Sequence, residues 1–234
     1  MDLKNATALI TGGSAGIGRA FAEKLAASGA HVAITGRDKA KLHATATALG
    51  VHPIHADVSL EADAERTIRE VVAHFGDLDI LVNNAGSGIF KNLVDFDLAG
   101  FQRVLATNVT GAMLMGREAA RHFVARQRGN IVNIGSTAAL RGAPNGTAYY
   151  ASKFAVRGMT ECWRAELRKH NIRVFLVNPS EVLTDFYPTA GLPQKANDSK
   201  LRGEEIAHAV KSALEMDDRG FITELTVFAT NPVD

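Results

Sequence analysis

The sequence predicts an α/β protein built around a single doubly wound parallel sheet with a helix layer on each face. Short apolar segments alternate with segments of helical spacing along the chain, and several of them end at glycines. The apolar segments are continuous rather than interrupted by polar residues, which is typical of strands covered by helices on both faces. Because the chain has 234 residues, we expect one domain spanning residues 1–234.

The strand and helix candidates follow one another in regular order. The strand candidates are residues 6–10, 31–35, 52–56, 79–83, 131–134, 172–177 and 224–228. The helix candidates between and after them are residues 17–27, 39–49, 63–75, 97–126, 149–169 and 204–216. Crossovers between parallel strands of one sheet are right-handed, so this order leaves few topologies.

Composition and charge exclude several classes of function. The 26 basic and 25 acidic residues give a net charge of +1, so no overall field attracts nucleic acid or an anionic membrane. No apolar segment approaches the roughly 20 residues that span a bilayer. The single cysteine, Cys162, forms no intrachain disulfide. The eight histidines are scattered, so no metal site is expected. We expect a cytoplasmic protein.

A glycine-rich segment follows the first expected strand. Thr11-Gly12-Gly13-Ser14-Ala15-Gly16-Ile17-Gly18 lets the backbone turn tightly and approach a diphosphate. The next helix directs its free N–H groups and positive dipole end toward such an anion. The spacing differs from the G-x-G-x-x-G fingerprint. A ligand-free turn is the alternative, but the place at the start of an α/β chain favours a nucleotide site.

This segment resembles the glycine motif of the short-chain dehydrogenase/reductase family. Asn83-Asn84-Ala85-Gly86 matches that family's Asn-Asn-Ala-Gly motif, and Asp57-Val58 resembles the pair in its adenine pocket. The resemblance covers nearly the whole chain and implies a Rossmann sheet of order 3-2-1-4-5-6-7, with the cofactor across the carboxyl ends of the strands. The cofactor residues it implies in this first half are Gly12, Ser14, Gly16, Ile17, Gly18, Asp57, Val58, Asn84, Ala85 and Gly86.

Tyr149 and Lys153 are four residues apart at the head of a helix candidate, so they share one face. An ammonium lowers the pKa of a nearby phenol from about 10, so Tyr149 can exchange a proton with a carbonyl or an alcohol. Alone, this pair more often means a core tyrosine and a surface lysine. By resemblance, Asn108, Ser136, Tyr149 and Lys153 form the family's catalytic tetrad, in which Ser136 binds the carbonyl oxygen and Asn108 helps hold a water of a proton relay. The neighbouring Tyr150 is assigned to packing.

The segment after the sixth strand candidate resembles the family's Pro-Gly-x-x-x-Thr motif. By that resemblance the Val182 backbone and the Thr184 hydroxyl contact the nicotinamide half of the cofactor, and Tyr149 and Lys153 also bind it. Ser180 stands where glycine is usual. Residues 181–203 are the expected substrate lid, and Phe186 and Tyr187 predict an apolar inner wall.

NADP(H) is the expected cofactor, with NAD(H) second. NAD-dependent relatives place an acid at the end of the second strand, where this chain has Gly36 followed by Arg37. A guanidinium pairs with a 2′-phosphate, and Ser14 adds a hydrogen bond. Asp38 is expected to cap the next helix instead. The alternative is that Arg37 is an ordinary solvated residue.

The sequence therefore predicts an NADP(H)-dependent oxidoreductase that transfers a hydride between nicotinamide and a ketone, aldehyde or secondary alcohol, with Tyr149 as general acid and base. A non-catalytic NADP(H) sensor or scaffold is the alternative. The motifs are also similar to those of 3-oxoacyl-carrier-protein reductases in the same family, which leaves an acyl-carrier-linked substrate open. The region after Gly220 lacks their Val-Asp-Gly-Gly ending. We expect a homodimer or homotetramer and no nucleic-acid or membrane partner.

Overall fold

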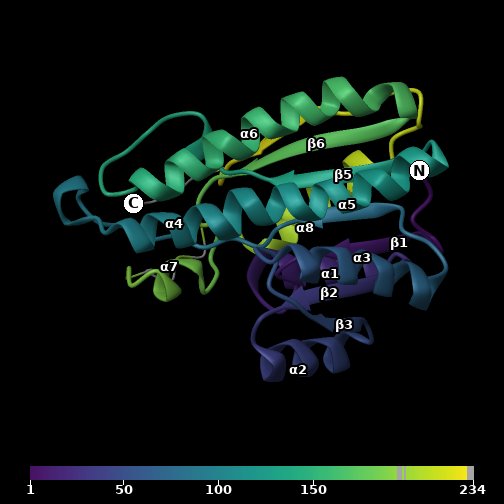
Figure 1. Cartoon of the computed structure of the whole chain (residues 1–234), viewed down its shortest axis with the longest axis horizontal. Helices are drawn as coiled ribbons and strands as arrows, with labels where there is room; N and C mark the ends of the chain where they lie inside the picture. Colours follow the sequence, from purple (N-terminus) through teal and green to yellow (C-terminus); the bar gives the residue numbers. More distant parts are fainter. Residues whose placement is uncertain (194–196, 198, 231–234) are drawn as a thin grey trace.

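A computed structural model describes residues 1–193, 197 and 199–230. Its sheet is parallel throughout and has seven strands in the order β3-β2-β1-β4-β5-β6-β7, which confirms the predicted fold class and strand order (Figure 1). The strands are β1 (Thr7–Ile10), β2 (His31–Gly36), β3 (His52–His55), β4 (Ile80–Asn83), β5 (Gly129–Ile134), β6 (Ile172–Pro179) and β7 (Glu224–Val227).

Helices cover both faces of this sheet, and the strands alternate their side chains between two cores. The α-helices are α1 (Gly16–Ala26), α2 (Lys39–Leu49), α3 (Glu61–Phe75), α4 (Leu98–Leu105), α5 (Gly111–Arg126), α6 (Thr147–Leu167), α7 (Phe186–Thr189) and α8 (Gly203–Leu214). In β1, Ala8 and Ile10 pack into one core with α1, α2 and α8. Leu9 points the other way, into the core formed with α3 and α5. Continuous apolarity in the strands follows from this double coverage.

The helix expected over residues 97–126 is present as a helical segment from Leu98 to Arg126, but it contains an irregularity that the prediction lacks. A π-helical turn, η2 (Ala106–Thr110), separates α4 from α5. The buried Asn108 lies within this turn, and its side chain bonds outside its own helix. Single π turns inside helices are frequent at functional sites. The apolar spacing of the segment does not reveal the extra residue, because the axis continues through the turn (Figure 1).

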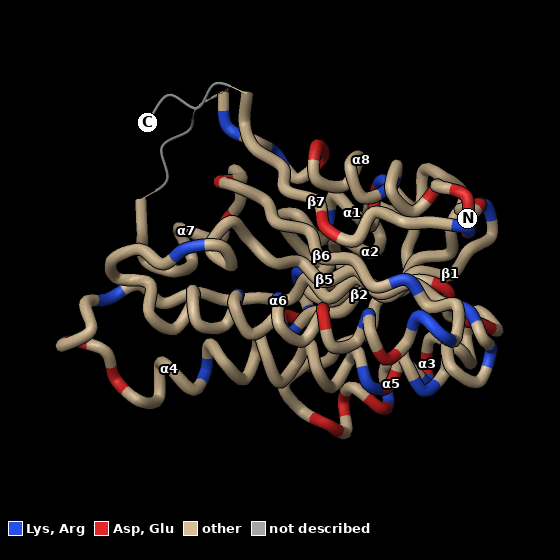
Figure 2. The backbone as a smooth tube through the Cα atoms, turned by 90° about the horizontal axis from the view of Figure 1, so that it is seen from above, with Lys and Arg blue, Asp and Glu red and all other residues tan. Residues whose placement is uncertain are grey.

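Charged residues lie mostly on the outer helices and loops, whereas the central strands carry few (Figure 2). Four arginines in and just after α5 each form an ion pair with a carboxylate of the same chain, namely Arg117, Arg121, Arg126 and Arg128. The basic stretch is therefore largely neutralised within the fold.

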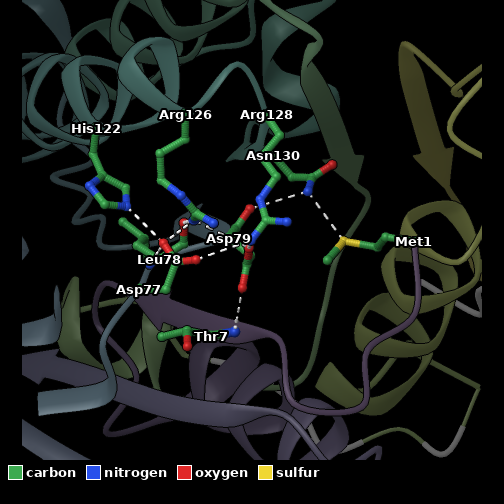
Figure 3. A network of polar contacts seen from close by, with 9 residues as sticks. All are labelled: Met1, Thr7, Asp77, Leu78, Asp79, His122, Arg126, Arg128 and Asn130. Carbon is green, nitrogen blue, oxygen red and sulfur yellow. Dashed lines mark hydrogen bonds and ion pairs between the residues drawn. The ribbon is translucent and has the colours of Figure 1, made fainter.

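A polar network ties the amino-terminal ends of three strands together (Figure 3). Asp77 accepts hydrogen bonds from His122 (2.9 Å), Arg126 and Arg128 (3.1 Å). Asp79 accepts the backbone N–H of the first residue of β1 (2.9 Å). Burial lowers the pKa of His122, so the imidazole is neutral at pH 7 and donates from Nε2. The network stabilises the edge of the sheet at the amino-terminal ends of the strands. The candidate site lies at the opposite edge, at their carboxyl ends.

Candidate active site

A cavity of about 370 Å³ opens at the carboxyl ends of the strands. Its walls come from the loops after β1, β2, β4, β5 and β6, from the first turns of α1 and α6, and from α7. The cavity meets the sheet where β1 lies between β2 and β4. This is the switch point at which strand order reverses, the usual place for ligands in open α/β sheets.

The glycine loop forms one rim of the cavity. Gly12 and Gly16 have φ values of +65° and +51°, a left-handed conformation that favours glycine. A Cβ at Gly18 would lie 2.4 Å from the Gly12 carbonyl oxygen, so the first turn of α1 packs directly on the loop. No side chain caps the N-terminus of α1 at Ala15. Its first N–H groups therefore remain available at the rim for a bound anion.

Thr11 joins this loop to the segment after β4. Its hydroxyl accepts hydrogen bonds from the backbone N–H groups of Asn84 and Ala85, each at 3.0 Å. In return the Asn84 side-chain amide donates to the Thr11 carbonyl at 2.9 Å. Thr11 is buried and was not among the predicted site residues, although it begins the glycine motif. These three hydrogen bonds hold the glycine loop against the segment after β4 at the edge of the cavity.

Tyr149 lies in the first turn of α6, and Lys153 lies one turn later on the same face. The Lys153 Nζ is 5.6 Å from the centre of the Tyr149 ring and donates to the Ile134 carbonyl at 2.8 Å. Ser136 accepts a hydrogen bond from the Ala138 N–H at 3.1 Å, and its hydroxyl lies near enough to the Tyr149 phenol to lower the pKa of that phenol. The three predicted side chains therefore meet in one wall of the cavity.

The electrostatics of this wall correct one expectation. Burial raises the pKa of Tyr149 above its usual value of 10, and the Ser136 hydroxyl offsets only part of that rise. Burial also lowers the pKa of Lys153 from 10.5 to about 8. The predicted lowering of the Tyr149 pKa by Lys153 is therefore wrong for the site as it stands. Desolvation of the phenolate outweighs the field of an ammonium that faces the ring.

Asn108 supports the wall from behind. Its Oδ1 accepts the Ser87 N–H at 2.8 Å, and its Nδ2 donates to the Ser87 carbonyl and to Ser152 Oγ, both at 2.9 Å. Ser152 Oγ in turn donates to the Tyr149 carbonyl at 2.6 Å. Asn108 thus links η2 to both the loop after β4 and the start of α6. Sequence reasoning missed Ser87 and Ser152, although each directly adjoins a motif residue.

The residues expected at the 2′-position of the cofactor gather at the end of β2. A Cβ at Gly36 would lie 3.1 Å from Ser14 Oγ, so these two positions are neighbours. The Arg37 side chain is exposed and lies 3.9 Å from Asp57. Asp38 accepts the Lys41 N–H at 2.9 Å and caps α2, as predicted, so its carboxylate is engaged with the helix.

The segment after β6 is anchored at its base and carries aromatic side chains. Val182 and Leu201 form an isolated parallel bridge, and the Leu183 N–H donates to the Leu201 carbonyl at 2.7 Å. Of the predicted lid, residues 194–196 and 198 lie outside the described residues. α7 lies on the side of the sheet away from the N-terminus of the chain (Figure 1). There Phe186 approaches the Tyr149 ring, with centroids 5.3 Å apart.

The model of the family described as short chain dehydrogenase matches residues 6–194. The chain belongs to this family. Its motif segments, found here around one cavity, are thus those of a short chain dehydrogenase, and the predicted resemblance is confirmed.

Three named relatives differ in what they act on. Sex determination protein tasselseed-2 of Zea mays is 40% identical over 190 residues, which span 78% of this chain and 56% of that protein, so the chain corresponds to little more than half its length. (+)-Borneol dehydrogenase 2 of Salvia officinalis is 39% identical over 83% of this chain and 70% of its own. L-xylulose reductase of Caenorhabditis elegans is 40% identical over 79% of this chain and 74% of its own.

Two solved structures are similar over nearly their whole length. A 3-ketoacyl-(acyl-carrier-protein) reductase from Brucella melitensis complexed with NADH has a TM-score of 0.90 and 31% identity, and the match covers 97% of this chain and 98% of that one. A metagenomic short-chain oxidoreductase in complex with NADP has a TM-score of 0.86 and 32% identity, covering 99% and 100%.

Most of the predicted site residues of this short chain dehydrogenase line the cavity. They are Gly12, Gly16, Ile17, Arg37, Asn84, Ala85, Gly86, Ser136, Tyr149, Lys153, Val182 and Thr184. Ser14, Gly18, Asp57, Val58 and Asn108 lie outside the lining. Asp57 bonds Ser59, and the Val58 side chain is buried where a Cβ on Gly111 would contact it.

Within residues 1–193, 197 and 199–230, no group of three or more histidine, cysteine or acidic side chains is placed to hold a metal ion. None of the helices in this described part combines the length and apolarity needed to cross a bilayer.

Proposed function

We propose that the protein is an NADP(H)-dependent oxidoreductase that interconverts a ketone or aldehyde with the corresponding alcohol, with Tyr149 as general acid and base. The observation that carries the proposal is the meeting of Ser136, Tyr149 and Lys153 in the wall of the cavity whose rim is the glycine loop. A nicotinamide cofactor supplies or accepts the hydride when it is bound. The protein then has to bind and orient the reactants and to move one proton.

The residues at the rim fit a dinucleotide. The uncapped N-terminus of α1 and the left-handed glycines 12 and 16 offer N–H groups and close backbone approach to a diphosphate. At the other end, a Cβ on Gly86 would lie 3.9 Å from the Lys153 Nζ, so the absence of a side chain there leaves Lys153 accessible. Lys153 would hold the nicotinamide ribose, and Val182 and Thr184 the nicotinamide side.

Tyr149 gives its phenolic proton to the carbonyl oxygen in reduction and takes it back in oxidation. Because burial raises the pKa of Tyr149, the phenol is protonated at neutral pH, which is the form that reduction requires. Ser136, which lies with Tyr149 in the cavity wall, donates to or accepts from the same substrate oxygen and fixes its position. Asn108 holds the backbone of α6 beneath the tyrosine through Ser152.

The NADP(H) preference rests on the end of β2. Gly36 leaves room beside Ser14 Oγ, and Arg37 is exposed at the cavity with only a 3.9 Å contact to Asp57. Arg37 is thus free to turn to a 2′-phosphate, while Asp38 stays on its helix cap. The similar structures contain NADH in one case and NADP in the other, so the proposed preference for NADP(H) is supported only by the residues at the end of β2.

The wider predictions belong to the same proposal. Residues 1–234 act as one catalytic domain with residues 181–203 as its substrate lid, in a cytoplasmic homodimer or homotetramer. The substrate is a small molecule. Relatives are named for borneol, L-xylulose and a carrier-linked ketoacyl group, so their names leave its class open. The pairing of the α5 arginines within the chain argues against an acidic carrier docking there.

The test is to follow NADPH consumption with a panel of ketones and aldehydes, together with Tyr149→Phe. We expect turnover to fall by roughly 10²–10⁴-fold in the variant, the usual size of a general acid-base contribution. NADPH affinity, measured by quenching of tryptophan fluorescence, should stay within about threefold because Tyr149 keeps its ring. A variant with near wild-type turnover would remove Tyr149 from the mechanism. Tight NADPH binding without turnover on any compound would favour the sensor alternative.

A further inference from the structure

Three aromatic side chains surround the catalytic end of the cavity. Phe90 comes from the loop after β4, and Phe186 and Tyr187 come from α7. The Tyr149 ring centre lies 5.5 Å from that of Phe90 and 5.3 Å from that of Phe186. Phe90 also lies 6.4 Å from Phe186 and 6.0 Å from Tyr187. These spacings are those of contacting rings, so the loop and α7 form one aromatic wall around the reactive phenol.

The backbone beneath this wall leaves no room for another side chain. A Cβ at Gly88 would lie 2.8 Å from Phe90 and 2.9 Å from Phe186, so both rings rest directly on the main chain. Phe90, Phe186 and Tyr187 are only partly buried. Phe186 and Tyr187 line the cavity, where they offer flat apolar surface to whatever enters, and Phe90 contacts both of these rings.

The charged side chains of the cavity lining are already engaged within the chain. Lys41 pairs with Asp185 at 3.2 Å, and Glu181 pairs with Lys200 at 2.7 Å. Lys153 donates to a main-chain carbonyl. Arg37 lies at the end of β2, beside Asp57. Among the described lining residues, Lys153 is the cation that faces the aromatic end, 5.6 Å from the centre of the Tyr149 ring, and the proposed function assigns it to the nicotinamide ribose.

We propose that this aromatic wall selects an apolar ring-containing ketone, alicyclic or aryl, and its secondary alcohol. The proposal rests on the proposed function, because it names the substrate class of the same site. A flat ring lies against the Phe186 and Tyr187 side chains, which line the cavity, with its carbonyl toward Tyr149 and Ser136. A polyol would place several hydroxyl groups against phenyl rings without hydrogen-bond partners, and burying an unpaired hydroxyl is unfavourable. An anionic tail would have to compete with the cofactor for Lys153.

The experiment compares two ring ketones, cyclohexanone and acetophenone, with L-xylulose and with a short 2-oxo acid. Each is assayed for kcat/KM with NADPH, and acetophenone binding is measured separately. For the latter, saturation-transfer NMR of the full chain with NADP⁺ and acetophenone reports contact without turnover, since this pair cannot exchange a hydride. Variants are Phe90→Ala and Phe186→Ala, with Phe90→Leu and Phe186→Leu to keep apolar volume if the alanine variants unfold.

The matched control is Phe75→Ala. Phe75 is also a partly buried ring in an aromatic cluster, stacked on His31 at 5.5 Å, but it lies at the end of α3, where it lines a separate pocket. We expect kcat/KM for the ring ketones to exceed that for L-xylulose and the 2-oxo acid at least 100-fold. The Phe90 and Phe186 variants should raise KM for acetophenone at least tenfold and weaken its NMR signal, and Phe75→Ala should change neither.

Equal or faster turnover of L-xylulose or the 2-oxo acid would overturn the substrate class while leaving the oxidoreductase proposal intact. Unchanged acetophenone binding in both Phe90 and Phe186 variants would overturn the role of the wall. If no compound is reduced but acetophenone binds and both variants lose it, the proposed catalysis fails and the aromatic site for ring ketones stands.

Discussion

We expect the ionisation of Lys153 to have a clear effect on how the free energy of unfolding depends on pH. Its residue is 7% exposed, and its ammonium donates to the Ile134 carbonyl. In the part of the chain that the structure describes, no carboxylate forms an ion pair with it. Burial without a counter-charge disfavours the ammonium, and the pKa of Lys153 falls from 10.5 to about 8.

The sign of the resulting pH dependence follows from proton counting. Below about pH 8 both folded and unfolded chains hold the proton, so the group adds no slope. Between about pH 8 and 10.5 the unfolded chain holds a proton that the folded chain has released, so the free energy of unfolding rises with pH. At about 1.4 kcal/mol per pKa unit, the gain between pH 7 and 9.5 is about 2 kcal/mol.

Lys153→Met keeps the length of the side chain and removes the charge. We therefore expect the free energy of unfolding of the wild type, relative to this variant, to rise by about 2 kcal/mol from pH 7 to 9.5. Urea unfolding of the cofactor-free protein measures it, with the single tryptophan, Trp163, as reporter because it packs against Gly116 on α5.

Lys169→Met is the matched control, since Lys169 is exposed just after α6 and the same change there should give a flat difference curve. If the difference in unfolding free energy between the wild type and Lys153→Met stays constant within about 0.5 kcal/mol from pH 7 to 9.5, the argument that burial lowers the pKa of Lys153 is refuted. A curve that falls with pH would mean that the folded state stabilises the charge instead.

Three further results are expected. Thr11→Val leaves the partly buried Asn84 and Ala85 N–H groups without their acceptor and should lower the free energy of unfolding by about 1–2 kcal/mol in urea titrations; a loss below about 0.5 kcal/mol would contradict the role of these two hydrogen bonds. The double change Gly36→Asp, Arg37→Ala should move the ratio of kcat/KM for NADPH over NADH toward NADH by at least about tenfold, and a wild type that already prefers NADH would contradict the assignment. Asp185→Asn breaks only an exposed ion pair with Lys41 and should change stability by less than about 1 kcal/mol, as checked by thermal unfolding.

The sheet was predictable because strands covered on both faces leave a direct trace in the sequence. The central predicted strands were mostly apolar segments, and the order of strands followed from a family resemblance carried by motifs at their ends. The cavity residues were predictable for a related reason, since the motifs adjoin the carboxyl ends of β1, β4, β5 and β6, which a parallel sheet brings to one edge.

The parts that the sequence did not predict depend on contacts between distant segments. The π turn around Asn108 forms where its side chain bonds Ser87 and Ser152, and helical spacing carries no sign of those partners. The burial that raises the pKa of Tyr149 depends on the rings of Phe90 and Phe186 closing over it, which spacing on one helix cannot show. Asp57 and Val58 matched a motif, yet they lie behind the cavity wall rather than in it.

The two perturbed groups of the site, Tyr149 and Lys153, bear on the choice between an enzyme and a sensor. The raised pKa of Tyr149 favours the neutral phenol, and the lowered pKa of Lys153 favours the neutral amine. Both shifts lower the charge that the pair carries in the absence of ligand. Burying an unpaired ammonium is unfavourable for folding, and a phenol shielded by aromatic rings contributes nothing to a diphosphate site on the opposite rim. Pairs of titratable groups with environments that perturb them strongly are typical of sites that move protons. The placement of Tyr149 beside Ser136, away from the glycine loop that is proposed to bind the diphosphate, therefore favours proton transfer over cofactor binding alone.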